Sequence, residues 1–391
     1  MRLFFIFIII STIFFSCDSK EHTKDQKAIE SKFSLLIYDS IDLPDLGLIN
    51  ISDYNPTTNS FLGFWGRNIV EFNDNGYFTY VDKFGNGPKE YYFQDKYDVN
   101  VKYYNDTIIC TNVYNYLKFF RKDGSFYKQL KVDNKESDFK RKILGVRIND
   151  TNKFVFDGFL EYDYNVFDKA TMYERTNVYR FFTFSGNTKE INQYGKFEEG
   201  NIIKKKQKTY STLSPKIVFN KKLDCIDILY SAEPKIFRYK LEDPDKIETV
   251  SLAPSYFSEK IFRTNDFYDS KYEERDQKDF IKSSYYYELY SAGDTIITVY
   301  RSGVKESLID EELGKNPSNM DFHHFYVKNF SKYIDFYING KKQINDIKLP
   351  KGHNPIYIGD SHHILLIKPD QELTKENKAI RRVYFTKLVH I

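Results

Sequence analysis

The sequence is poor in the residues that mark helical bundles, disulfide-rich proteins and structural zinc sites. Its 391 residues include one Trp, three Met and three Cys, and alanine is scarce. Alanine has the highest helix propensity, and few segments show sustained helical periodicity, so a helical fold is not expected. No CxxC pair and no Cys/His spacing of the zinc-binding kind occurs. We therefore expect no metal and no cofactor.

An excess of charge of one sign is also lacking. Lys and Arg number 58 and Asp and Glu number 55, which leaves a formal net charge of +3. The two signs alternate along the chain, as on a solvated surface. Domains that bind nucleic acid carry a strongly positive surface, so no nucleic-acid partner is expected.

A long apolar run occurs at the N-terminus. Met1 and Arg2 give a short positive start, Leu3 to Phe15 is apolar apart from two hydroxyl residues, and Ser16 and Cys17 precede a polar stretch. This pattern is typical of a signal peptide, and the run is shorter than the ~20 residues that span a bilayer. A cysteine after a small residue predicts a lipobox, with cleavage before Cys17 and lipid on its thiol. An uncleaved or plainly secreted protein is the alternative.

The predicted organisation follows from this start. Residues 1–16 form the signal peptide, 17–32 the lipidated Cys17 and a flexible polar tether, and 33–391 the folded domain. Two or three acyl chains bury many methylenes at ~0.8 kcal/mol each, so the anchor would hold the protein on a membrane. We expect a lipid-anchored protein of the cell envelope, on the outer membrane, facing the periplasm or the cell surface.

The two other cysteines lie in apolar, strand-like runs. Cys110 ends the run that starts at Thr107, and Cys225 precedes Ile226. Each is predicted to be a buried free thiol that packs like a small apolar side chain. A Cys110–Cys225 disulfide is the alternative.

Aromatic residues are abundant, with 35 Phe and 33 Tyr, and they recur in short strand-like runs divided by Gly, Asn and Asp. Strand–turn–strand units of this kind predict hairpins, because Asn-Gly and Asp-Gly favour the positive φ of tight turns. The predicted turns lie near residues 76, 124, 186, 243 and 340, with a weaker unit near 293. A repeat of about 50 residues is typical of propeller blades.

The sequence therefore predicts an all-β fold, a β-propeller of six or seven blades that follows the lipoprotein signal peptide. A pair of β-sandwiches or another meander is the alternative. Two charged stretches interrupt the strand pattern: residues 269–283 are predicted as a short helix within a loop, and residues 311–318 as a loop. Such excursions are expected on the face of a propeller where binding occurs.

One loop carries a family resemblance. Residues 82–91 read Asp-Lys-Phe-Gly-Asn-Gly-Pro-Lys-Glu-Tyr, which resembles the Gly-x-Gly-Pro-x-Glu-Tyr segment of propeller lipoproteins in Bacteroidota. The order of features along the chain resembles the family catalogued only as domain of unknown function 4221, which is related to the six-bladed propeller lipoproteins. The resemblance implies a propeller and an exported lipoprotein, and it implies no reaction. From the residues alone, Gly85 to Pro88 is a turn and not a phosphate loop.

Candidate ligand-binding residues come from two patterns. Tyr300 and Arg301 lie near Tyr285–Tyr287 in the sequence and predict either a polar-aromatic binding surface or a packed blade. The pairs His323-His324 and His362-His363 each follow an aspartate, which suggests a metal site. In a strand, however, neighbouring side chains point to opposite faces, so one histidine of each pair would face a common site. We take His323 and His362 as candidate ligand-binding residues and expect no metal.

The sequence lacks the common catalytic motifs. The sequence has no Gly-x-Ser-x-Gly elbow and no His-Glu-x-x-His, and acids such as Glu198, Glu199 and Asp294 form no distinctive pair. We therefore expect a non-enzymatic binding or scaffold propeller for a protein or glycan partner, and no catalytic residues. The alternative is an extracytoplasmic glycan-active enzyme, a hydrolase or lyase, with its site at the mouth of the propeller channel.

Overall fold

The computed structural model describes most of the chain between Phe33 and His390. The described residues are 33–43, 49–73, 78–81, 83–85, 87–91, 101–104, 108–113, 116–131, 145–148, 153–158, 178–185, 194–196, 216–220, 222–231, 233–240, 243–258, 278, 280–313, 318–360, 363–368, 372–373 and 379–390. They belong to one compact unit, Ser31–Ile391. The predicted signal peptide, Cys17 and the tether lie outside the described residues.

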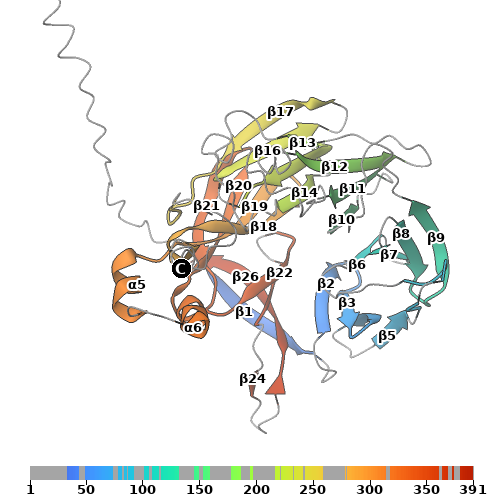
Figure 1. The fold of residues 1–391 in the computed structure, drawn as a ribbon, viewed down its shortest axis with the longest axis horizontal. Coiled ribbons are helices and arrows are strands. Elements are labelled where there is room, and N and C mark those ends of the chain that lie inside the picture. Colours follow the sequence, from blue (N-terminus) through green and yellow to red (C-terminus); the bar gives the residue numbers. More distant parts are fainter. Residues whose placement is uncertain are drawn as a thin grey trace, which may run out of the picture. The chain divides into compact units, whose positions relative to one another are not determined.

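Five four-stranded antiparallel sheets follow one another along the described chain (Figure 1). In each sheet the strands pair in sequence order. The first sheet contains β2 (Ile49–Asn55), β3 (Ser60–Trp65), β4 (Asn68–Asn73) and β5 (Phe78–Val81); the second contains β6 (Val101–Tyr103), β7 (Ile108–Val113), β8 (Tyr116–Arg121) and β9 (Phe126–Lys131); the third contains β10 (Gly145–Ile148), β11 (Lys153–Gly158), β12 (Val178–Ser185) and β13 (Tyr194–Lys196). The fourth contains β14 (Lys216–Asn220), β15 (Cys225–Leu229), β16 (Lys235–Lys240) and β17 (Asp243–Ser251), and the fifth contains β18 (Tyr285–Ala292), β19 (Thr295–Arg301), β20 (Lys332–Ile338) and β21 (Lys341–Lys348).

A sixth four-stranded sheet joins the two ends of the described chain. Its order is β1-β26-β23-β22, with bounds β1 (Phe33–Asp42), β22 (Asn354–Ile358), β23 (Ile364–Ile367) and β26 (Arg382–His390). β1 pairs with β26 from Phe33↔His390 to Asp42↔Arg382. A small ribbon of β24 (Glu372–Leu373) and β25 (Ala379–Ile380) extends from the segment before β26. We call the β1-β26-β23-β22 sheet the closing sheet.

Neighbouring sheets contact one another mainly through their first strands. β2 contacts β6, β6 contacts β10, β10 contacts β14 and β14 contacts β18. The closing sheet contacts the first sheet through β22 and β2, and the fifth sheet through β1 and β21. The chain is thus an all-β protein with a propeller-like arrangement of sheets, as the sequence predicted.

The repeated hairpins of the sequence are the last two strands of the first five sheets. β4–β5, β8–β9, β12–β13, β16–β17 and β20–β21 all pair antiparallel. Gly124 at φ 80°, and Asn339 and Gly340 at φ 49° and 73°, supply the left-handed turn conformations expected there. The turn predicted near 243 lies between β16 and β17, where Lys240 pairs with Asp243. One detail was wrong. The unit near Gly293 joins β18 to β19 within the same sheet as the turn at Gly340, so it is not a separate repeat.

Two helices lie between β19 and β20: α5 (Glu306–Glu312) and α6 (Asn319–Asn329). The predicted loop over 311–318 is therefore wrong at its start, where Glu311 and Glu312 are helical. A capping box starts α6: the Asp321 amide donates to Ser318 Oγ (3.2 Å), and the Ser318 amide donates to Asp321 Oδ2 (2.8 Å). Residues 280–282 are helical as expected, while 269–277 lie outside the described residues.

The core lies between adjacent sheets. Phe61 and Phe72 of the first sheet stack at 5.2 Å and pack with Leu365, Val383 and Phe385 of the closing sheet. Similar clusters of buried aliphatic and aromatic side chains join the first sheet to the second, the fourth to the fifth, and the fifth to the closing sheet. Within the described residues, no helix has the length and apolarity required to cross a membrane.

Candidate functional site

A cavity of about 610 Å³ opens where the turn after β2 meets one face of the closing sheet. Its lining combines aromatic rings with oxygen and imidazole groups. The lining residues are Tyr38, Asp39, Ile41, Tyr54, Pro56, Thr57, Asn59, Tyr357, Gly359, Asp360, His363 and Phe385. We call this cavity the aromatic groove.

A single cross-strand row forms the base of the aromatic groove. Asp39 on β1 pairs with Phe385 on β26, Phe385 with Leu365 on β23, and Leu365 with Tyr357 on β22. A β-bulge between Ile37 and Asp39 inserts one extra residue, Tyr38, into β1. The Tyr38 side chain is 51% exposed, and its ring centroid is 6.3 Å from that of Phe385. The bulge therefore places an exposed tyrosine at the rim.

The opposite wall comes from the turn between β2 and β3. Asn59 adopts φ 48° and accepts a 2.6 Å hydrogen bond at Oδ1 from the Tyr54 hydroxyl. The Thr57 amide donates to Asn55 Oδ1 at 2.9 Å, an Asx turn that fixes the start of this loop. The Tyr54 ring lies edge-on to Tyr357 at 5.0 Å. The wall is thus held by local hydrogen bonds and by ring contacts with the closing sheet.

Two carboxylates and one imidazole give the groove its polar character. His363 Nδ1 lies 3.0 Å from Asp360 Oδ1, and the His363 amide donates to the same oxygen at 2.9 Å. Because a carboxylate only accepts hydrogen bonds, His363 carries its proton on Nδ1 in this contact. Burial, followed by the charges of Asp360 and Asp53, raises the pKa of Tyr357, so this phenol stays protonated. Among the described residues of the chain, the lining includes no Lys and no Arg.

This combination suits a small polar ring better than an apolar or anionic ligand. Aromatic faces bind the C–H edges of a sugar ring, while carboxylate, amide and imidazole groups accept its hydroxyl protons. An anionic ligand would meet Asp39 and Asp360, and the described lining offers no Lys or Arg to balance it. The groove is large enough for one or two sugar rings, because ligand pockets of about 300–1,000 Å³ bury drug-sized molecules.

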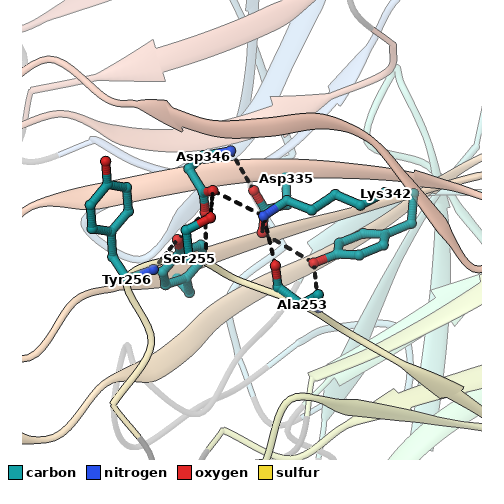
Figure 2. A network of polar contacts seen from close by, with 8 residues as sticks. Ala253, Ser255, Tyr256, Asp335, Lys342 and Asp346 are labelled. Atoms are coloured by element: carbon teal, nitrogen blue, oxygen red, sulfur yellow. Dashed lines mark hydrogen bonds and ion pairs between the residues drawn. The ribbon is translucent and has the colours of Figure 1, made fainter. Parts of the chain in front are cut away.

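A second polar cluster lies on the fifth sheet, and Figure 2 shows it from close by. Lys342 Nζ contacts Ala253 O at 2.8 Å, Asp346 Oδ2 at 3.0 Å and Asp335 Oδ2 at 3.3 Å. The Asp346 amide donates to Asp335 Oδ1 at 2.6 Å, and the Ser255 amide donates to Asp346 Oδ1 at 3.1 Å. We call these residues, with Tyr300 and Tyr337, the carboxylate network.

The carboxylate network fastens the segment after β17 to β20 and β21. Burial raises the pKa of Asp335 to about 7. Burial opposes ionisation of Asp346 too, but hydrogen bonds from Ser255, Tyr300 and Lys342 outweigh it and lower its pKa. The two acids therefore titrate far apart. Because the polar groups of this cluster bond to one another, its evident role is to hold the segment in place.

The structure buries both predicted residues of β19. The Arg301 side chain is fully buried, and its guanidinium carbon lies 3.8 Å from the ring centroid of Tyr285, 4.0 Å from Phe280 and 4.2 Å from Phe330. The Tyr300 hydroxyl donates to Asp346. Of the two alternatives for this pair, the structure shows the packed blade.

The structure describes the two predicted histidines only in part. His323 lies in α6 and not in a strand, and its side chain is outside the described ones. His362 is outside the described residues, whereas its neighbour His363 lines the aromatic groove. Among the described residues, no group of three or more His, Cys, Asp or Glu side chains is placed to hold a metal. Cys225 is a buried free thiol, and the Cys110 side chain is not described.

Nothing in the sequence marks the groove residues as a set. Tyr38 and Tyr54 lie about 300 residues before Tyr357 in the chain. A local signal is Asp360-Ser361-His362-His363, whose second histidine lines the groove. The pairing of β1 with β26 brings the other residues together.

The loop that carries the family resemblance has a structural role. The Gly87 amide donates to Glu90 Oε2 at 2.8 Å, and a Cβ on Gly85 would lie 2.1 Å from the same oxygen. Tyr91 is fully buried, and its hydroxyl donates to Arg67 O at 3.1 Å while accepting from the Ile69 amide. The predicted turn is confirmed, and the glycines leave room for the glutamate that closes it.

Comparison with solved structures agrees with this resemblance. A member of the domain of unknown function 4221 family from Bacteroides vulgatus superposes with a TM-score of 0.60 at 12% sequence identity, over 92% of this chain and 99% of that chain. The two proteins share a fold. The resemblance to family 4221 is thus confirmed at the level of the fold, although no family model and no curated protein matches the sequence.

Two enzymes are also similar, at lower scores. A virginiamycin B lyase from Staphylococcus aureus has a TM-score of 0.38 at 12% identity, over 90% of this chain and 99% of that chain. A luciferin-regenerating enzyme has a TM-score of 0.44 at 8% identity, over 89% of this chain and 95% of that chain. Scores this low give no basis for transferring an activity.

Proposed function

We propose that this chain is an outer-membrane lipoprotein, lipidated on Cys17, whose propeller binds a glycan in the aromatic groove without converting it. The observation that carries the binding role is the groove itself, which combines four aromatic rings with carboxylate, amide and imidazole groups. The apolar run and Ser16-Cys17 of the sequence support the anchor. A protein partner is the weaker option, because the lining offers no large flat apolar surface.

The sheets support a propeller of six blades. Six four-stranded sheets occur in the described part of the chain, and each contacts the next in order. The sixth takes one strand from the start of the domain and three from its end, so it closes the series. A seventh blade would need a further sheet between two that already touch.

A second candidate function is the extracytoplasmic glycan-active enzyme. One observation favours it: Asp360 holds His363 through Nδ1, which leaves Nε2 to accept a proton from a substrate. The Asp360 and His363 side chains are 53% and 63% exposed, however, so water screens the pair. Binding without turnover is therefore the better-supported function.

The glycan-binding role is tested by titrating the full-length lipoprotein in detergent with a panel of neutral and amino-bearing oligosaccharides by calorimetry. Tyr38→Ala is expected to weaken binding at least about tenfold, because it removes the rim ring. Tyr127→Ala is the matched control, since Tyr127 is a similarly exposed tyrosine on β9, away from the groove. Binding that is equal in both variants, or no binding by any sugar, contradicts the proposal. Release of shortened or unsaturated products would favour the enzyme.

The anchor is tested separately by Cys17→Ser in the native host. The expected result is an unprocessed precursor that takes up no labelled palmitate. Ser19→Ala, two residues further on, is the control and is expected to be processed and lipidated normally. A Cys17→Ser protein that is cleaved at the same bond and stays with membranes would show that the thiol is not the anchor.

A further inference from the structure

We propose that the sugar in the aromatic groove carries a free ammonium group, as an amino sugar without N-acylation does. This inference rests on the glycan-binding role proposed above and names the chemistry that the groove selects. It is carried by the pairing of aromatic rings with carboxylates, and by the charge of the lining as a whole.

The lining charge is negative. Among the described lining residues, Asp39 and Asp360 are the carboxylates, His363 is the one basic side chain and contacts Asp360, and there is no Lys or Arg. A neutral sugar ring that covers these carboxylates removes water from them and supplies only hydroxyl donors in return. An ammonium group supplies a charge as well as hydrogen bonds, and a charge-assisted hydrogen bond is roughly twice as strong as a neutral one.

Two described lysines lie near the groove but not among its described lining residues. Lys102 is paired at 3.3 Å with Asp53, whose charge acts on Tyr357. Lys387 places its Nζ 5.6 Å from the ring centroid of Tyr38, so this ring is within cation–π range of an ammonium group.

The aromatic lining is compatible with a cationic ligand. Tyr38, Tyr54, Tyr357 and Phe385 present rings to one cavity. Ring faces are negative and attract cations, and aromatic walls are a recurring means of binding ammonium ligands. Rings alone would accept a neutral sugar equally well. The carboxylates that accompany them favour the cation.

The test compares two sugars that differ in one group. Chitosan oligosaccharides carry a free amine on C2 of each ring, and chitin oligosaccharides of equal length carry an N-acetyl group there. Both are titrated into the full-length lipoprotein by calorimetry at pH 6. The expected result is binding of the free-amine oligosaccharide at least about tenfold tighter than the acetylated one, with a preference that shrinks as salt is raised.

Variants separate charge from stacking. Asp39→Asn and Asp360→Asn each keep the size of the side chain and are expected to reduce the preference several-fold. Tyr38→Ala is expected to weaken both oligosaccharides. Asp310→Asn, at an exposed position of α5, is the control and is expected to change neither. Circular dichroism checks folding, and Asp39→Asn serves alone if Asp360→Asn disturbs the turn that holds His363.

Each of the other possible outcomes overturns the ammonium inference, the glycan-binding role or both. Equal or tighter binding of the acetylated sugar overturns the ammonium inference and leaves the glycan-binding role intact. Binding of neither amino-sugar series, when another oligosaccharide binds, also overturns the inference alone. Binding of no oligosaccharide overturns both proposals. Binding of a lysine-rich peptide without binding of any oligosaccharide overturns both in favour of a protein partner.

Discussion

The carboxylate network on the fifth sheet and the aromatic groove on the closing sheet use the same residue types in opposite ways. In the network, tyrosine hydroxyls and a lysine bond to Asp335 and Asp346, and both acids are buried. In the groove, Asp360 and the rim residue Tyr38 are about half exposed and face an open cavity. Tyrosine and aspartate side chains therefore stabilise the fold where they are buried and bond to one another, and face solvent where they line a cavity.

The largest contrast is expected when one acid is removed from each region. Asp346→Ala leaves Lys342 and the Tyr300 hydroxyl short of their buried acceptor and is expected to lower the free energy of unfolding by about 3–5 kcal/mol. Asp39→Ala is expected to change it by less than about 0.5 kcal/mol. Urea unfolding of both variants measures the difference. Equal losses would show that the groove acid is also structural.

A smaller effect is expected from pH. Burial raises the folded pKa of Asp335 to about 7, above the 3.8 of an exposed aspartate, so the folded state binds the extra proton between these values. The stability of the wild type should therefore fall as pH rises from about 4 to about 7, by at most about 1.4 kcal/mol per pH unit from this group.

The variant Asp335→Asn isolates that contribution. It keeps an oxygen acceptor for the Asp346 amide and does not titrate. The difference in unfolding free energy between wild type and variant should decline over pH 4–7 and level off above it. A difference that stays constant with pH would mean that Asp335 is ionised throughout.

The smallest effects are expected from single hydroxyl groups. Tyr300→Phe removes a buried donor to the Asp346 carboxylate and is expected to cost about 1.5–3 kcal/mol. Tyr54→Phe removes a part-buried donor to the neutral Asn59 amide and is expected to cost about 0.5–1.5 kcal/mol. Chemical unfolding measures the loss of stability in both variants. A larger loss for Tyr54→Phe than for Tyr300→Phe would contradict the contrast between the carboxylate network and the aromatic groove.

The sequence predicted what depends on neighbours along the chain. Asp123-Gly124 and Asn339-Gly340 indicated hairpins because positive φ is a local requirement, and both hairpins form. The Ser318-x-x-Asp321 capping box was also local and was missed, so the His323 pair was assigned to a strand although it lies in α6.

Local sequence patterns could not predict the aromatic groove, and the reason is physical. Tyr38 and Phe385 share a cavity because β1 pairs with β26, and no sequence pattern specifies pairing between strands about 350 residues apart. The burial of Arg301 was equally hidden, because it depends on Phe330 and Phe280 arriving from separate segments. Side chains brought together by distant strands are therefore seen only in the structure.

The pairing of β1 with β26 has a consequence for when the groove forms during folding. β26 completes the sheet on which the groove lies, so a chain from which β26 is missing lacks that side of the groove. Pairing of such distant segments is slow, because a long loop must close before any contact rewards it. A ligand of the proposed groove would therefore bind only after the two ends of the domain have met, and cleavage that releases β26 would end binding.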